Sequence, residues 1–186
     1  MILAGIAVAS FTGALTALAL NFAPNPFAAS EIMFWLLGSL ADRSFEHVGL
    51  AAPFMAAGAA MLFAQARAYD ALTLGEAAAA TLGFDLRRVA GWTVLGVALG
   101  VGAATAVAGA IGFVGLATPH LVRRHVAHRP GAVLGASALA GATLTLLADI
   151  AARLIAPAEE IKLGVLTALL GAPFFVHLIR QHRRRG

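Results

Sequence analysis

Three histidines within a short segment are the first candidates for metal chemistry in this chain: His120, His125 and His128. Imidazole nitrogens bind zinc and other transition metals, and the spacing of His125 and His128 allows both to share one face of a helix. A zinc or iron site also needs converging carboxylates or further imidazoles, and the two arginines of the same segment repel a cation. We therefore predict no metal site here and expect His120 to hydrogen-bond to nearby backbone.

Acidic side chains mark two further places where chemistry is conceivable. Asp149 and Arg153 are one helical turn apart in an apolar run, and an ionisable pair inside a membrane is a functional candidate by default. Because residues at i and i+4 can neutralise each other, we interpret these two as a structural ion pair. Glu159 and Glu160 follow Pro157 at the start of another apolar segment, where carboxylates stabilise the positive end of a helix.

No arrangement of side chains predicts catalysis. The serines lack the spacing of a nucleophile elbow; they are Ser10, Ser30, Ser39, Ser44 and Ser137. The chain contains no cysteine, which excludes disulfides and thiolate metal sites. We predict that the protein is not an enzyme and carries no cofactor.

The composition predicts a protein that crosses a membrane several times. Of the 186 residues, 60% are hydrophobic and only 12% are charged, whereas soluble domains have about a quarter charged residues. Uncharged runs cover Val48–Ala66, Val89–Thr118 and Pro130–Ala148, and about 20 apolar residues suffice to cross the hydrocarbon layer. The basic residues lie at the ends of these runs, so the net charge of +4 does not indicate a nucleic-acid partner.

We expect an all-α transmembrane helix bundle that forms one domain over residues 1–186. The expected spans are 1–22, 47–66, 89–110, 111–128 (broken and short), 132–155 and 161–179. Met1–Leu20 lacks the basic start of a signal peptide and is apolar for longer than one, so we interpret it as a span. Between the first two spans, Ser30 and Glu31 are expected to begin an interfacial helix that contains Trp35.

Basic residues fix the expected orientation, because cytoplasmic loops carry an excess of Lys and Arg. Ten of the 13 basic residues fall on one side, namely Arg67, Arg87, Arg88, Arg123, Arg124, Arg129, Arg180, Arg183, Arg184 and Arg185. Only Arg43, Arg153 and Lys162 fall on the other side. We therefore predict that both termini lie in the cytoplasm.

This orientation requires a broken crossing. A span that runs outward over 89–110 must return to the inside before Arg123, which leaves only the stretch 111–122. As α-helix, about twelve residues would cover only ~18 Å of the ~30 Å hydrocarbon layer. Irregular backbone at membrane depth is tolerated where protein surrounds it, and broken helices of this kind are common in transporters.

The residues of the broken crossing suit such a passage. Gly112 and Gly115 allow an extended chain, and Thr118 is expected to cap a short helix whose first residue is Pro119. In the alternative interpretation, a single tilted helix covers most of 89–118 and the residues after it are cytoplasmic.

Residues 67–88 are expected to form a helix–turn–helix elbow on the cytoplasmic side. The stretch "GEAAAATLG" predicts a short helix that ends at Gly83, and Asp85 is placed to cap the following span. The elbow is either a solvated connector or a docking surface for a cytoplasmic partner.

Several motifs resemble the FecCD-type permeases: "GAIGFVGLATPHLVRR", "LADIAARL", "EIKLGVLTALLGAPFF" and "TLGEAAAATLG". Members of that family are the membrane subunits of ATP-driven importers for iron–siderophore complexes, haem and cobalamin. The resemblance covers essentially the whole chain, which is similar to the C-terminal half of such a permease, from its fifth to its tenth helix.

The resemblance implies a permease subunit of an ATP-binding-cassette importer in the bacterial cytoplasmic membrane, with ATP hydrolysis on a separate subunit. Implied partners are a cytoplasmic ATP-binding subunit, a substrate-binding protein, a second permease copy or paralogue, a separate N-terminal half, and membrane lipid. Contacts to the ATPase are implied within the elbow 72–88, at Leu72, Leu74, Gly75, Glu76, Ala79, Leu82 and Gly83. Glu159 or Glu160 would contact the binding protein. The alternative is a truncated membrane protein that transports nothing and has no ATPase partner.

Overall fold

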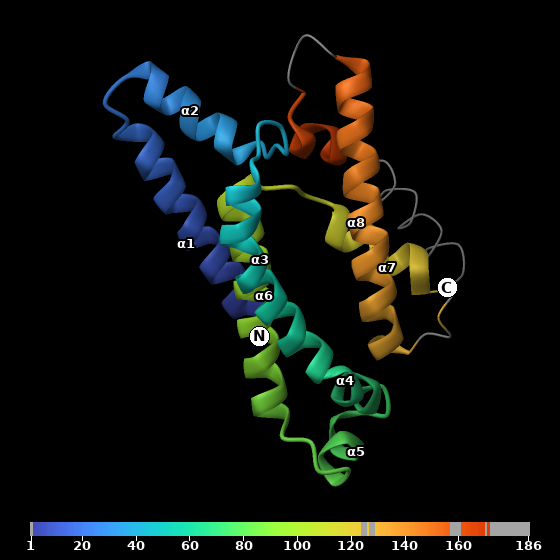
Figure 1. Cartoon of the computed structure of the whole chain (residues 1–186). Coiled ribbons are helices and arrows are strands. Elements are labelled where there is room, and N and C mark those ends of the chain that lie inside the picture. The colour runs from blue at the N-terminus through green and yellow to red at the C-terminus, as the bar shows by residue number, and fades with distance from the viewer. Residues whose placement is uncertain (1, 124–125, 127–128, 157–160, 170, 172–186) are drawn as a thin grey trace, which may run out of the picture. The chain divides into compact units, whose positions relative to one another are not determined.

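The computed structural model describes residues 2–123, 126, 129–156, 161–169 and 171 (Figure 1). In these residues the chain forms helices and no strand, which confirms the predicted all-α class. The eight named helices are α1 (Ile2–Asn21), α2 (Pro26–Leu36), α3 (Phe45–Ala64), α4 (Ala66–Leu72), α5 (Glu76–Thr81), α6 (Leu86–Ala108), α7 (Val114–Arg123) and α8 (Pro130–Ile155). Residues 163–169 are also helical. The chain divides into two compact units between Leu36 and Leu37.

Within the described residues, four helices are long and apolar enough to cross a membrane. They occupy Leu3–Asn21, Phe45–Ala64, Leu86–Ala108 and Pro130–Ile155, and they overlap four of the expected spans. Most of their side chains are not covered by the rest of the chain. Such surfaces are suited to contact with lipid or with further helices.

The first unit consists of α1 and α2. The start expected for α2 at Ser30 is wrong, because the helix already begins at Pro26. The side chain of Asn25 accepts a hydrogen bond from the Ala28 N–H at 2.8 Å, and the ring of Pro26 fixes a helical φ at the first position. Ser30 lies inside the helix, where its hydroxyl donates to the Phe27 carbonyl at 2.8 Å.

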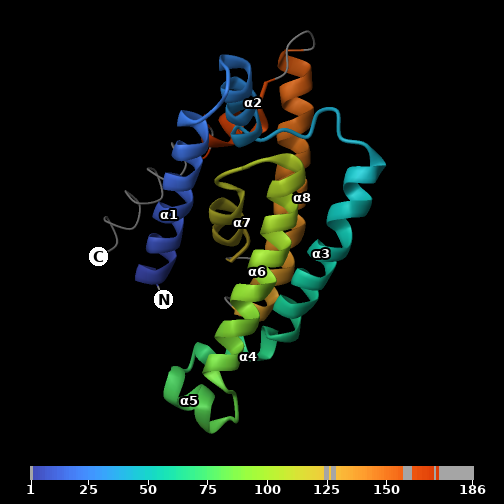
Figure 2. The same ribbon diagram turned by 90° about the vertical axis from the view of Figure 1, so that its left-hand side faces the viewer.

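In the second unit, α3 and α6 form the most extensive helix pair (Figure 2). A Cβ atom at Gly58 of α3 would lie 2.5 Å from the Gly96 carbonyl oxygen and 2.8 Å from the Gly100 nitrogen of α6. The two backbones therefore touch directly, as small residues allow in membrane helices. The short helix α7 packs against α8, where Gly141 faces Val114 and Thr118.

Three segments of the second unit meet in a junction formed by Leu37–Ser39, Ala108–Ala110 and Leu163–Gly164. The Ser39 N–H donates to the Ala108 carbonyl at 2.7 Å, and the Gly164 N–H donates to the Leu37 carbonyl at 3.0 Å. A side chain at Gly164 would overlap the carbonyls of Leu37 and Ala110. Leu163 beside it is only 1% exposed. The end of α6 is thereby fastened to two segments that are distant in sequence.

The Gly58 contact predicts a position-specific effect of one added methyl group. Gly58→Ala should lower the thermal midpoint of the purified protein in detergent, because the new Cβ meets backbone that cannot rotate away, and overpacking costs ~1–3 kcal/mol. Gly49→Ala in the same helix is the matched control, since nothing lies within 4 Å of its added Cβ. Alanine is favoured over glycine in helices by ~1 kcal/mol, so this control should keep or raise the midpoint. Equal midpoints for both variants would contradict the close approach of α3 and α6.

Candidate functional site

The elbow between α3 and α6 contains two short helices, α4 and α5, at one end of the helix pair (Figures 1 and 2). A single residue, Gln65, separates α3 from α4 and has φ −91° and ψ 4°. The sequence indicated α5 but not α4, which has no side-chain cap at its start. The spacing of Ala68 and Ala71 was the available signal, because both side chains are buried on one face of α4.

The second helix of the elbow ends at the glycine that the sequence indicated. Gly83 has a φ of +88°, and its N–H donates to the Ala80 carbonyl. The Phe84 N–H donates to the Ala79 carbonyl at 3.2 Å. These two bonds form a Schellman motif, which satisfies the last carbonyls of α5.

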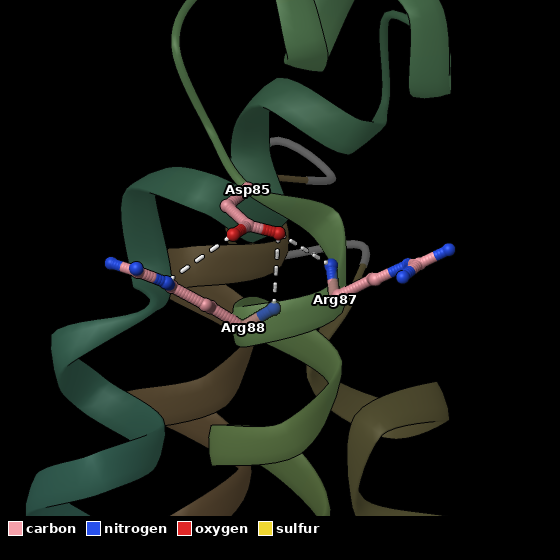
Figure 3. A network of polar contacts seen from close by, with 3 residues as sticks. All are labelled: Asp85, Arg87 and Arg88. Carbon is pink, nitrogen blue, oxygen red and sulfur yellow. Dashed lines mark hydrogen bonds and ion pairs between the residues drawn. The ribbon is translucent and has the colours of Figure 1, made fainter.

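Asp85 caps α6, as predicted (Figure 3). Its Oδ1 accepts hydrogen bonds from the N–H groups of Arg87 at 3.0 Å and Arg88 at 3.3 Å. Its Oδ2 also lies 3.3 Å from Arg88 Nε. Both side chains of this ion pair are more than half exposed, so the backbone cap is the stronger contribution of the carboxylate.

The residues expected to contact an ATPase differ in their exposure. Leu74 is 69% exposed and Leu82 is 61% exposed. Gly75, Glu76 and Gly83 are exposed as well, and Leu72 is half-buried. Ala79 is different, because its side chain is 0% exposed and supports α5 from inside the elbow. Ala79 is therefore not part of the exposed surface of the elbow.

Two polar contacts of α4 were missed by the sequence analysis. The Tyr69 hydroxyl lies 2.8 Å from the Thr93 hydroxyl of α6. The Asp70 carboxylate accepts a hydrogen bond from the Gly131 N–H of α8 at 2.8 Å. The partners are far from α4 in sequence, so no local spacing could indicate either contact.

The expected break in the crossing is present. Helix α6 ends at Ala108, residues 109–113 are not helical, and α7 begins at Val114. Gly109 ends α6 with a φ of +74°, a conformation that is accessible to glycine at little cost. The alternative of one tilted helix over most of 89–118 is therefore wrong.

The start predicted for the short helix after the break is wrong. Thr118 does not cap it, because Thr118 is buried inside α7 and its hydroxyl donates to the Val114 carbonyl at 2.9 Å. Pro119 follows within the helix, where it cannot donate to the Gly115 carbonyl. The helix starts earlier because Phe113 takes a φ of +65° and turns the chain.

Phe113 organises the first turn of α7. Its carbonyl accepts hydrogen bonds from Leu116 at 3.1 Å and Ala117 at 2.9 Å, and the Val114 N–H donates to Gly112 at 2.8 Å. Gly112 is thus part of the irregular passage, whereas Gly115 is helical. A positive φ is unusual for a bulky side chain, so this turn depends on its surroundings.

The other candidate residues are scattered. His120 is half-buried in the last turn of α7. Asp149 and Arg153 form an ion pair, with 2.9 Å between Asp149 Oδ2 and Arg153 Nε. His125, His128, Glu159 and Glu160 lie outside the described residues. Within the described part of the chain, no three His, Asp or Glu side chains converge as metal ligands would.

The family model and the similar proteins agree on one family. Residues 1–181 match the FecCD transport family. The chain is 39% identical over 186 residues to the vitamin B12 import system permease protein BtuC of Vibrio cholerae, covering 98% of this chain and 55% of that protein. It is 35% identical to the Fe(3+) dicitrate transport system permease protein FecD of Escherichia coli, covering 97% of this chain and 56% of that protein. The chain thus spans about half the length of these relatives.

A solved structure has the same fold. It is described as an inward-facing conformation of a metal-chelate type ABC transporter, and it superposes with a TM-score of 0.88 at 31% identity. The match covers 96% of this chain and 59% of that one. The broken crossing and the elbow therefore belong to a helix arrangement that is known in membrane transport.

The Asp85 cap predicts a local effect of removing its carboxylate. Asp85→Ala should speed amide hydrogen exchange at Arg87 and Arg88, because both N–H groups lose their acceptor; loss of such a cap costs ~1 kcal/mol. Asp85→Asn keeps an acceptor oxygen and is the matched control. Unchanged exchange in Asp85→Ala, measured by mass spectrometry in detergent, would show that the cap does not hold this turn.

Proposed function

The chain belongs to the FecCD transport family, and we propose that it acts as a permease subunit of an ATP-binding-cassette importer. The cargo would be an iron–siderophore complex, haem or cobalamin, moved across the cytoplasmic membrane. The names of the relatives support this class of cargo, since they include permeases for vitamin B12, Fe(3+) dicitrate and hemin. The chain itself would hydrolyse no ATP.

The observation that carries the proposal is the elbow. It presents Leu74 and Leu82, both more than 60% exposed, and the exposed Glu76. The elbow lies beyond the ends of two helices that are long and apolar enough to cross a membrane. Exposed apolar side chains in water mark a protein–protein contact. We infer that a cytoplasmic ATP-binding subunit docks here.

The proposed orientation puts the elbow and both termini in the cytoplasm. Arg67, Arg87 and Arg88 flank the elbow, and Arg123 ends α7. The excess of basic residues on cytoplasmic loops supports this placement. The junction of Leu37–Ser39 with Ala108–Ala110 then lies at the outer side, where a substrate-binding protein would dock.

The packing supports a route for motion from the elbow. The elbow is joined to α3 through Gln65 and to α6 through the capped Asp85. Because Gly58 brings the backbones of α3 and α6 into contact, a push on the elbow would tilt the two helices together. A second permease copy or paralogue would complete the pathway.

A pull-down from native membranes tests the docking surface. Tagged protein is purified in mild detergent, and the chains that co-purify are identified by mass spectrometry. We expect recovery of an ATP-binding subunit, and at least a tenfold loss of it in the Leu74→Glu, Leu82→Glu double variant, because charge would replace the apolar contact. The matched control is Phe45→Glu, since Phe45 is 94% exposed at the end of α3 away from the elbow.

The outcomes separate the proposal from its alternative. Recovery of the ATP-binding subunit with the control but not with the double variant supports docking on the elbow. Equal recovery of the ATP-binding subunit with both variants would show that it is a partner but does not dock on this surface. Recovery of no ATP-binding subunit at all would favour the truncated protein that transports nothing.

A further inference from the structure

Arg129, the described residue directly before α8, does not cap the first turn of this helix with its side chain. The helix begins at Pro130. The first N–H groups of a helix have no partner inside it. The Gly131 N–H is satisfied from the elbow instead, by the Asp70 carboxylate of α4 at 2.8 Å. Asp70 therefore does for α8 what an N-cap residue does, from 61 positions away.

Direct packing surrounds this hydrogen bond. A Cβ atom at Gly131 would lie 3.2 Å from Ala66 Cβ and 3.2 Å from Asp70 Oδ2. Two successive turns of α4 thus touch the same residue of α8. An added Cβ at position 131 would require these neighbours to shift by a few tenths of an ångström, so the glycine permits the close approach of the two helices.

Helices α4 and α8 are in contact around this hydrogen bond. Next to it lies a cavity of about 400 Å³ between α4, α7 and α8, whose lining includes Thr73, Arg123 and Ser137. On its other side α4 is tied to α6 by the Tyr69–Thr93 hydrogen bond of 2.8 Å. Helix α4 therefore bridges the α3–α6 pair and α8.

We propose that Asp70 is a positioning residue that fastens the elbow to α8, so that α4 and the first turn of α8 move as one rigid piece during transport. The inference rests on the proposed function, because that function requires the elbow to move during transport. The Asp70 contact would pass this motion to α8 without a covalent connection. Helix α8 has 26 residues and is ~39 Å long at 1.5 Å per residue. It also carries α7 on its side, so the segment after the break moves with the elbow too.

A disulfide between α4 and α8 tests this rigidity. The Ala66→Cys, Gly131→Cys pair suits it, because the Cβ separation of 3.2 Å is within a few tenths of an ångström of the range for disulfides. The chain has no cysteine of its own, so the unchanged chain controls for cysteines of the partners. Cross-linking with copper phenanthroline is followed in the complex recovered from native membranes, with and without trapping by ATP and vanadate. The ATPase rate is measured before and after oxidation.

If α4 and α8 move as one piece, the cross-linking rates in the resting and trapped states should agree within twofold. Oxidation should change the ATPase rate less than twofold. A cross-linking rate at least tenfold lower in the trapped state, or loss of ATPase activity on oxidation, would show that α4 and α8 separate and would overturn the proposal. If no ATP-binding subunit is recovered from the membranes, the cross-link still reports whether α4 contacts α8. Failure of the proposed function is therefore distinguished from failure of this inference.

Substitution of Asp70 in the same cysteine pair tests the role of the carboxylate. Asp70→Asn keeps an acceptor for the Gly131 N–H and should cross-link within twofold of the parent in both states. Asp70→Ala should cross-link at least fivefold more slowly than the parent in the trapped state. Its rate in the resting state shows whether the variant is folded. Equal trapped-state rates for Asp70→Ala and Asp70→Asn would overturn the role of this residue.

Discussion

The structure depends on one constraint, which is that backbone polar groups buried away from water need partners within the protein. The helix break at 109–113 would leave such groups without partners, and other parts of the chain satisfy several of them. Ser39 donates to the last carbonyl of α6, and Phe113 accepts two hydrogen bonds from α7. Gly164 lies so close to Leu37 and Ala110 that no side chain fits. Three segments far apart in sequence must therefore meet where one helix stops.

The rest of the second unit follows from this arrangement. The junction fixes the far end of α6, and the contact of Gly58 with Gly96 fixes its middle against α3. The elbow is thereby attached to a stiff pair of helices. Ala68 and Ala79 provide the small buried surfaces that α4 and α5 require.

Local signals in the sequence were sufficient where the structure is locally determined. The uncharged runs indicated the long helices, Gly83 indicated the end of α5, and Asp85 indicated the cap of α6. Thr118 and Pro119 misled because the same two residue types that begin a helix also occur inside one, and the real start depends on Phe113 in an unusual conformation. The contact of Asp70 with Gly131 spans 61 positions, and only the folded chain brings the two together.

The ion pair of Asp149 and Arg153 has an electrical consequence. A single elementary charge that moves through the full membrane potential exchanges about 2.3 kcal/mol per 100 mV. The two side chains are joined at 2.9 Å near one end of α8, so their charges cancel and travel together. A displacement of α8 then moves no net charge of this pair through the field, and the voltage across the membrane does no net work on the pair.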